Sequence, residues 1–295
     1  MQAVHPQTKP KKLHPFLKRI IEYRALLVMM IPAIIFFAVF CYYPMYGVTL
    51  AFKDFKILEG IGGSPWVGFK YFRQMFEDPY FFKTVANTLI ISCYKLIFGF
   101  PAPIIFALLL NEVRNIHFKK VVQTVSYLPY FMSWVIMGSI FFSLLSLNGP
   151  INAILEMIGL EPIMFMGDSS VFRGVLVVTD VWKGFGWGSI LYIAAISGID
   201  QEMYEAARLD GANRFQNAWY ITIPSILPVI CINLILSLSG ILNAGFDQVF
   251  NMYSEVVYDV ADIIDTYVYR LGMKSMQYSL CLLYTSPSPR DPKTS

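Results

Sequence analysis

Polar side chains embedded in apolar stretches are the residues of this sequence whose types and spacing could do chemistry. The main candidates are Asp180, Trp182, Lys183, Trp187 and Asn243. A charge inside a membrane-spanning helix is costly and normally faces a cavity or a partner, and a tryptophan ring can stack on the C–H face of a sugar. We therefore expect these five side chains to line a path through a membrane, with Lys95 and Asp247 as further candidates of the same kind.

Two other interpretations of these residues stay open. Asp180 and Lys183 are three positions apart and share one helix face, so the two charges could simply neutralise each other. Trp182 and Trp187 could equally be packing residues or anchors at the membrane interface.

The sequence has no catalytic or metal-binding pattern. The three histidines, His5, His14 and His117, have neither triad nor metal-ligand spacing, and the four cysteines form no CxxC pair. A GxxxxGKS/T phosphate-binding loop is missing too, so we do not expect the chain to hydrolyse ATP itself. We predict no catalytic residues, no metal and no cofactor.

Composition indicates which elements position the candidate residues. Of 295 residues, 56% are hydrophobic and only 15% are charged, and the mean hydropathy is +0.53. A soluble domain of this length needs more charge to cover its surface. The apolar residues form blocks of about 20, the helix length that crosses a bilayer core. Because backbone groups in lipid must bond to each other, and barrel-like alternation is missing, we predict an all-α polytopic transmembrane bundle.

Five spans are expected in a transmembrane domain of residues 25–280, after a cytoplasmic segment 1–24. Their ranges are 25–45, 84–110, 121–147, 175–196 and 221–244. Lysine and arginine are concentrated before the first span and at 111–120, whereas the loop 148–170 has acidic residues but no lysine or arginine. The positive-inside rule therefore places the N-terminus, the second-to-third loop and, by alternation, the fourth-to-fifth loop in the cytoplasm.

Three segments outside the spans have their own patterns. The segment 46–83 is predicted to be external, and its piece SPWVGFKYF is predicted to form a small surface cap. The amphipathic stretch INAILEMIGL is predicted to lie at the membrane interface. The end of the chain, CLLYTSPSPRDPKTS, is too rich in serine, proline and charge to cross a membrane, and it resembles translated sequencing-adapter read-through. We therefore expect a sixth span to be missing and residues 281–295 to be a non-native tail.

The predicted cytoplasmic loop 198–224 has the pattern of a helix, a turn and a second helix. Asp200 fits an N-cap before a short helix at 201–209. Gly211 follows where a left-handed turn is favourable only for glycine. A second short helix, 213–220, is expected to break before the next span begins.

The stretch EAARLDGANRFQNAWYITIPSILP in this loop resembles the EAA loop of permease subunits of binding-protein-dependent ABC importers. The family pattern is EAA, three residues, G, nine residues and then I-x-L-P. The matching positions are Glu205, Ala206, Ala207, Gly211, Ile221 and Pro224, with Ile223 where leucine is usual. Small alanines allow a partner groove to approach closely, and Glu205 can pair with a partner cation. The resemblance implies an ATPase-coupling role for Glu205, Ala206, Ala207, Asp210, Gly211 and Pro224.

Other stretches resemble the carbohydrate-uptake branch of that family. They are PMYGVTLAFKDF, WVGFKYFRQMF, NTLIIS, DVWKGFGWGSILYIAAISGID and VADIIDTYVYRLGM, the last two similar to its polysaccharide and oligosaccharide subgroup. The resemblance implies an inner-membrane subunit of an ATP-driven sugar importer. Its implied partners are a second homologous permease, a dimeric ABC ATPase, an extracytoplasmic solute-binding protein and membrane lipid, with no nucleic acid.

Other classes predict features that the sequence lacks. A secondary transporter should show inverted repeats, and a membrane-embedded enzyme should concentrate His, Asp or Glu at one membrane face; we find neither. An amino-acid or phosphate permease of the same family stays open, and the sequence does not name the sugar.

Overall fold

The structure, a computed structural model of the protein, is helical throughout the part that it describes. The described residues are 23–274, 276 and 278–279. They form helices and loops, together with one isolated β-bridge between Lys53 and Trp66, so the predicted all-α class is confirmed. The expected tail 281–295 lies outside the described residues, as does nearly all of the segment 1–24.

Four helical stretches of the described chain are long and apolar enough to cross a membrane. They are Arg24–Phe52, Pro79–Asn111, Trp134–Met157 and Arg214–Ser239. Each overlaps one of the predicted spans. The remaining predicted span, 175–196, lies in helix α10 (Ser169–Ser197), whose 29 residues include Arg173, Asp180 and Lys183. Helix α10 is long enough to cross a membrane. Its three charged residues lower its hydropathy, which explains why it is not among the four apolar stretches.

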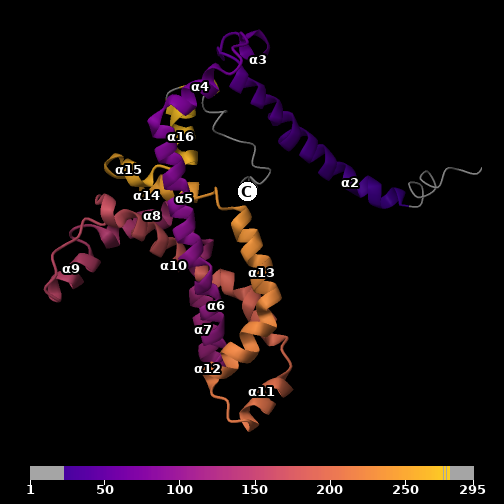
Figure 1. Ribbon diagram of the computed structural model, residues 1–295, viewed down its shortest axis with the longest axis vertical. Helices are drawn as coiled ribbons and strands as arrows, with labels where there is room; N and C mark the ends of the chain where they lie inside the picture. The colour runs from indigo at the N-terminus through magenta and orange to yellow at the C-terminus, as the bar shows by residue number, and fades with distance from the viewer. Residues whose placement is uncertain (1–22, 275, 277, 280–295) are drawn as a thin grey trace, which may run out of the picture.

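The first stretch stands apart from the rest of the molecule. Helix α2 (Arg24–Phe37) continues through η1 (Ala38–Tyr42) and η2 (Tyr43–Phe52), and no residue of α2 is buried. Figure 1 shows α2 running away from the other helices. Its apolar surface is therefore open to lipid or to another protein.

The segment after η2 folds into a small cap that includes the predicted piece SPWVGFKYF, residues 64–72. It contains the helices α3 (Gly60–Gly63) and α4 (Lys70–Glu77). Phe52 stacks on Trp66 beneath them, with ring centroids 5.9 Å apart. In Figure 1 the cap lies at one end of the long axis.

Helix α10 is the centre of the bundle. Helices α5 (Pro79–Gly99) and α6 (Pro101–Asn111) form a nearly continuous rod that is interrupted at Phe100, and α10 packs along both. Helix α13 (Ile223–Ser239) packs on α10 as well. A buried apolar cluster joins α6, α10 and α13; its members are Ala107, Tyr192, Ile196 and Ile226.

The predicted span 121–147 is wrong as a single helix. Helix α7 (Ile116–Tyr127) passes into the short η3 (Leu128–Phe131), and α8 (Trp134–Leu145) starts in a new direction. The backbone becomes extended at Ser133, whose hydroxyl caps α8 by accepting a hydrogen bond from the Ile136 amide at 3.4 Å. A proline within η3 supplies no amide hydrogen, which favours ending a helix there. Helix α9 (Pro150–Met157) follows α8 and largely exposes its apolar side chains.

The chain after α13 forms short helical pieces. They are α14 (Phe246–Met252), η5 (Glu255–Val257), α15 (Tyr258–Ala261), α16 (Ile264–Tyr269) and η6 (Arg270–Lys274). A buried carboxylate organises them, because Asp262 Oδ2 lies 2.5 Å from Arg270 Nη2 and accepts a hydrogen bond from Tyr80 Oη at 2.7 Å. Thr266 Oγ1 donates to Asp262 Oδ1 at 2.7 Å. This network ties α16 and η6 to the start of α5.

Replacing Gly186 by alanine is expected to destabilise the bundle. A Cβ at Gly186 would lie 2.0 Å from the Ser126 carbonyl oxygen on α7. Because this oxygen is a backbone atom, it can move away only if helix α7 is displaced or distorted. Overpacking of this kind costs about 1–3 kcal/mol or more. The matched control is Gly174→Ala, also on α10, where a Cβ meets nothing within 4 Å. The control should be neutral or stabilising by up to about 1 kcal/mol. Thermal unfolding in detergent measures both; equal melting temperatures would refute the close-packing role of Gly186.

Candidate functional site

The predicted EAA segment forms helix α11 (Gln201–Leu209), with both expected ends. Asp200 Oδ1 accepts a hydrogen bond from the Glu202 amide at 3.0 Å, which confirms the predicted N-cap. Gly211 has φ +84°, the left-handed conformation expected of it. The Ala212 amide then donates to the Ala207 carbonyl at 2.9 Å and closes the helix.

The expected break between 213–220 and the next span is wrong. Helix α12 (Arg214–Asn217) starts with a capping box between Asn213 and Gln216, and it continues through η4 (Ala218–Thr222) directly into α13. Because Pro224 has no amide hydrogen to donate to the preceding turn, the wider π-helical turn just before it keeps the helix continuous. α12, η4 and α13 are therefore one apolar stretch, Arg214–Ser239.

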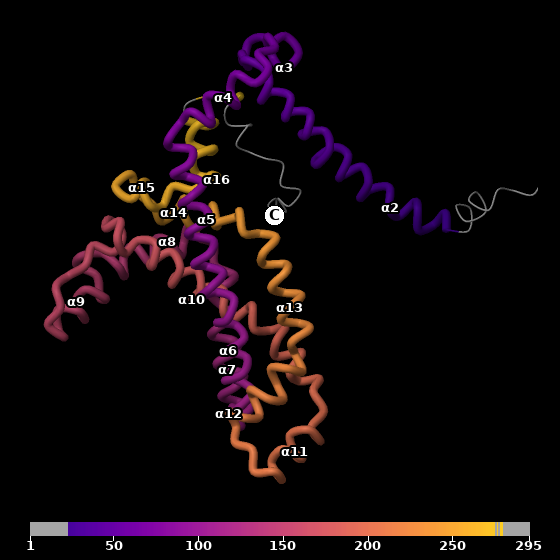
Figure 2. The backbone as a smooth tube through the Cα atoms, in the orientation of Figure 1, coloured from indigo at the N-terminus to yellow at the C-terminus, as the bar shows by residue number. Residues whose placement is uncertain are grey.

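The surface of α11 is open. No residue of the helix is buried, Leu209 is 91% exposed, and Phe215 on α12 is 75% exposed. Glu205 is exposed and forms no salt bridge within the part of the chain that the structure describes. Figures 1 and 2 place α11 and α12 at the end of the molecule opposite the cap. Of the other predicted coupling residues, Ala206, Asp210 and Pro224 are exposed, and Ala207 is half-buried.

A hydrogen bond joins this exposed helix to the spans. The hydroxyls of Tyr204 and Thr222 lie 2.9 Å apart, and Thr222 is only 2% exposed at the base of α13. Arg214 Nε also lies 3.6 Å from a carboxylate oxygen of Glu112, in the loop after α6. We did not predict the role of Tyr204 from the sequence, because its partner is eighteen positions away and the pattern of a short helix does not indicate it.

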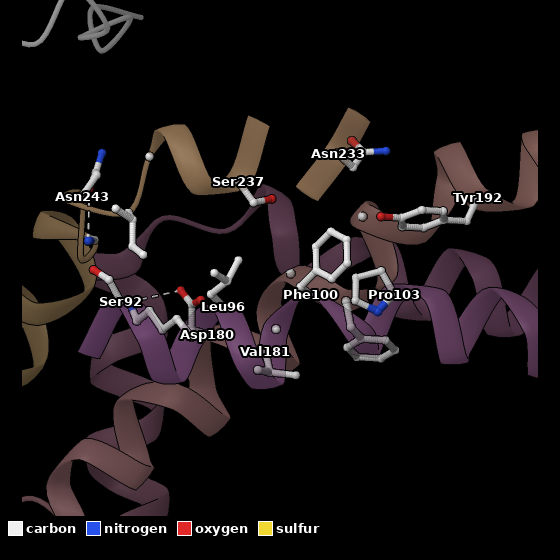
Figure 3. Close-up of a pocket in the computed structure, with 18 residues that line it drawn as sticks. Ser92, Leu96, Phe100, Pro103, Asp180, Val181, Tyr192, Asn233, Ser237 and Asn243 are labelled. Atoms are coloured by element: carbon white, nitrogen blue, oxygen red, sulfur yellow. Dashed lines mark hydrogen bonds and ion pairs between the residues drawn. The ribbon is translucent and has the colours of Figure 1, made fainter. Parts of the chain in front are cut away.

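A cavity of about 410 Å³ lies among α5, α6, α10, α13 and the turn after α13. Asp180 and Asn243 line it, as Figure 3 shows. Ser92, Phe100, Tyr192, Asn233 and Ser237 also line the cavity. Its wall thus combines amides, hydroxyls and aromatic rings around one carboxylate and the ammonium of Lys95.

The other three predicted pathway residues lie outside this lining. Trp187 stacks on Tyr130 of η3, with centroids 4.9 Å apart. Lys183 Nζ donates to the Tyr130 carbonyl at 3.0 Å, and Trp182 packs edge-on against a phenylalanine of α8. The salt bridge of Asp180 is with Lys95 of α5, whereas Lys183 forms no salt bridge with Asp180 in the part of the chain that the structure describes.

A multi-helical chain with apolar spans, a polar cavity between them and an exposed helix–turn–helix at one end has the architecture of a polytopic membrane protein. Residues 99–283 match the family described as binding-protein-dependent transport system inner membrane component. The chain belongs to this family, so it is a multi-pass inner-membrane permease subunit and not an enzyme.

Individual relatives agree with the family. Protein LplB of Bacillus subtilis (strain 168) is 45% identical over 255 residues, 86% of this chain and 80% of the relative. The polygalacturonan/rhamnogalacturonan transport system permease protein YteP of the same organism is 43% identical over 272 residues, 92% of this chain and 85% of the relative. A chain of the bacterial alginate ABC transporter, solved in complex with an alginate pentasaccharide-bound periplasmic protein, is 37% identical. Its TM-score is 0.84, with 92% of this chain and 91% of that chain covered.

Proposed function

We propose that the chain is the membrane-spanning subunit of an ATP-driven importer that moves oligosaccharides or polysaccharide fragments across the inner membrane. The observation that supports this best is the open α11 surface, which the Tyr204–Thr222 contact joins to a span beside a polar cavity. The names of YteP and of the alginate transporter support carbohydrate as the cargo.

In this proposal α10 also crosses the membrane, in addition to the four uniformly apolar stretches. Its charged residues all have partners inside the protein: Arg173 Nη2 donates to Asn87 Oδ1 at 2.8 Å, Asp180 pairs with Lys95, and Lys183 bonds to a backbone carbonyl. Charges satisfied in this way are tolerated within a bundle. The N-terminus and the α11–α12 hairpin then face the cytoplasm, as the distribution of lysine and arginine predicts.

The proposed mechanism is alternating access. A dimeric ABC ATPase binds α11, with Glu205 pairing to a cation of the ATPase and Gly211 supplying the bend. Closure of the ATPase on ATP moves α11, and the Tyr204–Thr222 contact transmits the movement to α13 against α10, which opens and closes the cavity. A second homologous permease completes the path, and an extracytoplasmic solute-binding protein delivers the sugar.

The function is tested by uptake of labelled oligosaccharides into proteoliposomes that contain the chain and its companion subunits. Sugar uptake that depends on ATP is expected, with no uptake of amino acids or phosphate. Uptake of an amino acid or phosphate instead would overturn the carbohydrate assignment. Uptake without any ATPase present would overturn the importer class.

Tyr204→Phe is expected to weaken coupling without stopping it. The change removes one hydrogen bond, worth about 1 kcal/mol, between α11 and Thr222, so less sugar should be imported for each ATP hydrolysed. The matched control is Tyr220→Phe, because Tyr220 is exposed on η4 in the same loop. The ratio of uptake to phosphate release measures the effect. An unchanged ratio in Tyr204→Phe would exclude this contact as the transmitting link.

A further inference from the structure

The cavity contains one buried cation. The Lys95 side chain is 11% exposed, and its Nζ donates to the Ala244 carbonyl at 2.8 Å and to Gln248 Oε1. Both of these acceptors are neutral. The carboxylate of Asp180 is the salt-bridge partner of Lys95 and accepts a third hydrogen bond at 3.4 Å, but the Asp180 side chain is 38% exposed. The buried lysine charge is therefore balanced by a single carboxylate that itself lines the cavity and is partly exposed.

Neighbouring residues fix the position of the Lys95 ammonium. Gln248 is fully buried, and its Nε2 donates to the Leu176 carbonyl at 2.7 Å and to Thr179 Oγ1 at 2.8 Å, which fixes Oε1 toward Lys95. Gly245 has φ +89°, and a Cβ there would lie 2.8 Å from Lys95 Nζ. The turn after α13 therefore leaves room for the ammonium at the cavity wall.

A second polar group lines the cavity one turn earlier on α5. Ser92 is 6% exposed, and its hydroxyl has no hydrogen-bond partner among the described residues. Ser92 and Lys95 are three residues apart and share a helix face. A carboxylate that approached Lys95 could accept a hydrogen bond from this hydroxyl as well.

From these contacts we infer that Lys95 binds the carboxylate of a uronate-containing oligosaccharide in the cavity. The sugar carboxylate takes the place of Asp180 on the ammonium, and Asp180, released into the cavity, accepts hydrogen bonds from ring hydroxyls. Phe100 and Tyr192 supply apolar faces for the sugar ring. The inference rests on the proposed function and narrows it to acidic sugars. The names of two relatives agree, since polygalacturonan is a uronate polymer and alginate is an acidic polysaccharide.

The test compares two probes that differ only at the carboxyl groups: an oligogalacturonate trimer and its carboxyl-reduced counterpart, which has neutral hydroxymethyl groups in their place. Uptake is measured in proteoliposomes that contain the complete transporter. The wild type should import the acidic trimer faster. Lys95→Gln should lower uptake of the acidic trimer about tenfold or more, as expected for loss of a charged hydrogen bond, and leave the neutral trimer within about twofold. Lys56→Gln is the control, because it removes the same charge from the exposed cap.

A second variant keeps the inference testable if Lys95→Gln fails to fold. Asp180→Asn keeps Lys95 and removes its competitor, so the ratio of acidic to neutral uptake should rise. Equal uptake of the two trimers by the wild type, a parallel loss of both in Lys95→Gln, or a fall of the ratio in Asp180→Asn would overturn the role of Lys95 and leave sugar import standing. Failure to import any oligosaccharide, acidic or neutral, would refute the proposed function itself.

Discussion

Glu205→Lys and Gly211→Val are each expected to abolish ATP-driven uptake while the chain still inserts into the membrane. The first reverses the charge of an exposed carboxylate that has no salt bridge within the described chain, so the proposed attraction to a cation on the ATPase would become a repulsion. The second places a β-branched residue at φ +84°. That conformation costs a non-glycine residue roughly 1–3 kcal/mol, so the turn after α11 must change shape.

Matched variants outside the α11–α12 loop separate coupling from folding. Glu156→Lys reverses an exposed charge on α9, and Gly159→Val strains another left-handed glycine, at φ +82°, that also has open space around it. Both should retain uptake. The measurements are membrane insertion, ATPase activity of the assembled complex and sugar uptake. Normal uptake by Glu205→Lys and Gly211→Val would show that α11 is not the coupling helix.

Asp262→Ala is expected to have the largest effect on stability, a loss of about 3–5 kcal/mol. The Asp262 side chain is 1% exposed, and its removal leaves Arg270 with its guanidinium mostly buried and without a counter-charge. The Tyr80 hydroxyl loses its acceptor as well, and the Thr266 hydroxyl keeps only the Ile263 carbonyl. The cost is that of leaving a buried charge unpaired, which exceeds the net worth of the pair itself.

Asp259 provides the comparison, three positions earlier in the same segment. Its side chain is 72% exposed and pairs with Lys83 at the surface. Exposed ion pairs contribute about 0–1 kcal/mol, so Asp259→Ala should lower the free energy of unfolding only slightly. Denaturant unfolding in detergent, followed by tryptophan fluorescence, measures both variants. Similar losses in the two would mean that burial of Asp262 has no energetic role.

Block hydropathy was sufficient to predict the spans that are uniformly apolar. It was insufficient at η3 and Ser133, because a proline inside an apolar run is compatible both with a kinked span and with a chain turn. At Pro224 the opposite happened: proline suggested a break, whereas a π-helical turn absorbed the missing donor. In both places the outcome depends on packing rather than on the local sequence.

The two candidate sites differ in how far sequence could define them. The ends of α11 are set by local chemistry, an aspartate cap and a left-handed glycine, and both predictions are confirmed. The partner of Asp180 is Lys95, 85 positions away on another helix, so spacing along α10 suggested Lys183 instead. Trp182 and Trp187 pack on side chains of η3 and α8, whose positions follow from the turn at Ser133.

The interruption between α5 and α6 gives the bundle a natural joint. Pro101 and Pro103 each lack an amide hydrogen, so the turn around Phe100 has fewer backbone bonds to break than any regular helical turn, and bending costs least there. Phe100 and Pro103 also belong to the cavity wall. A small rotation of α6 relative to α5 at Phe100 therefore widens or narrows the cavity, while each of the two helices stays straight.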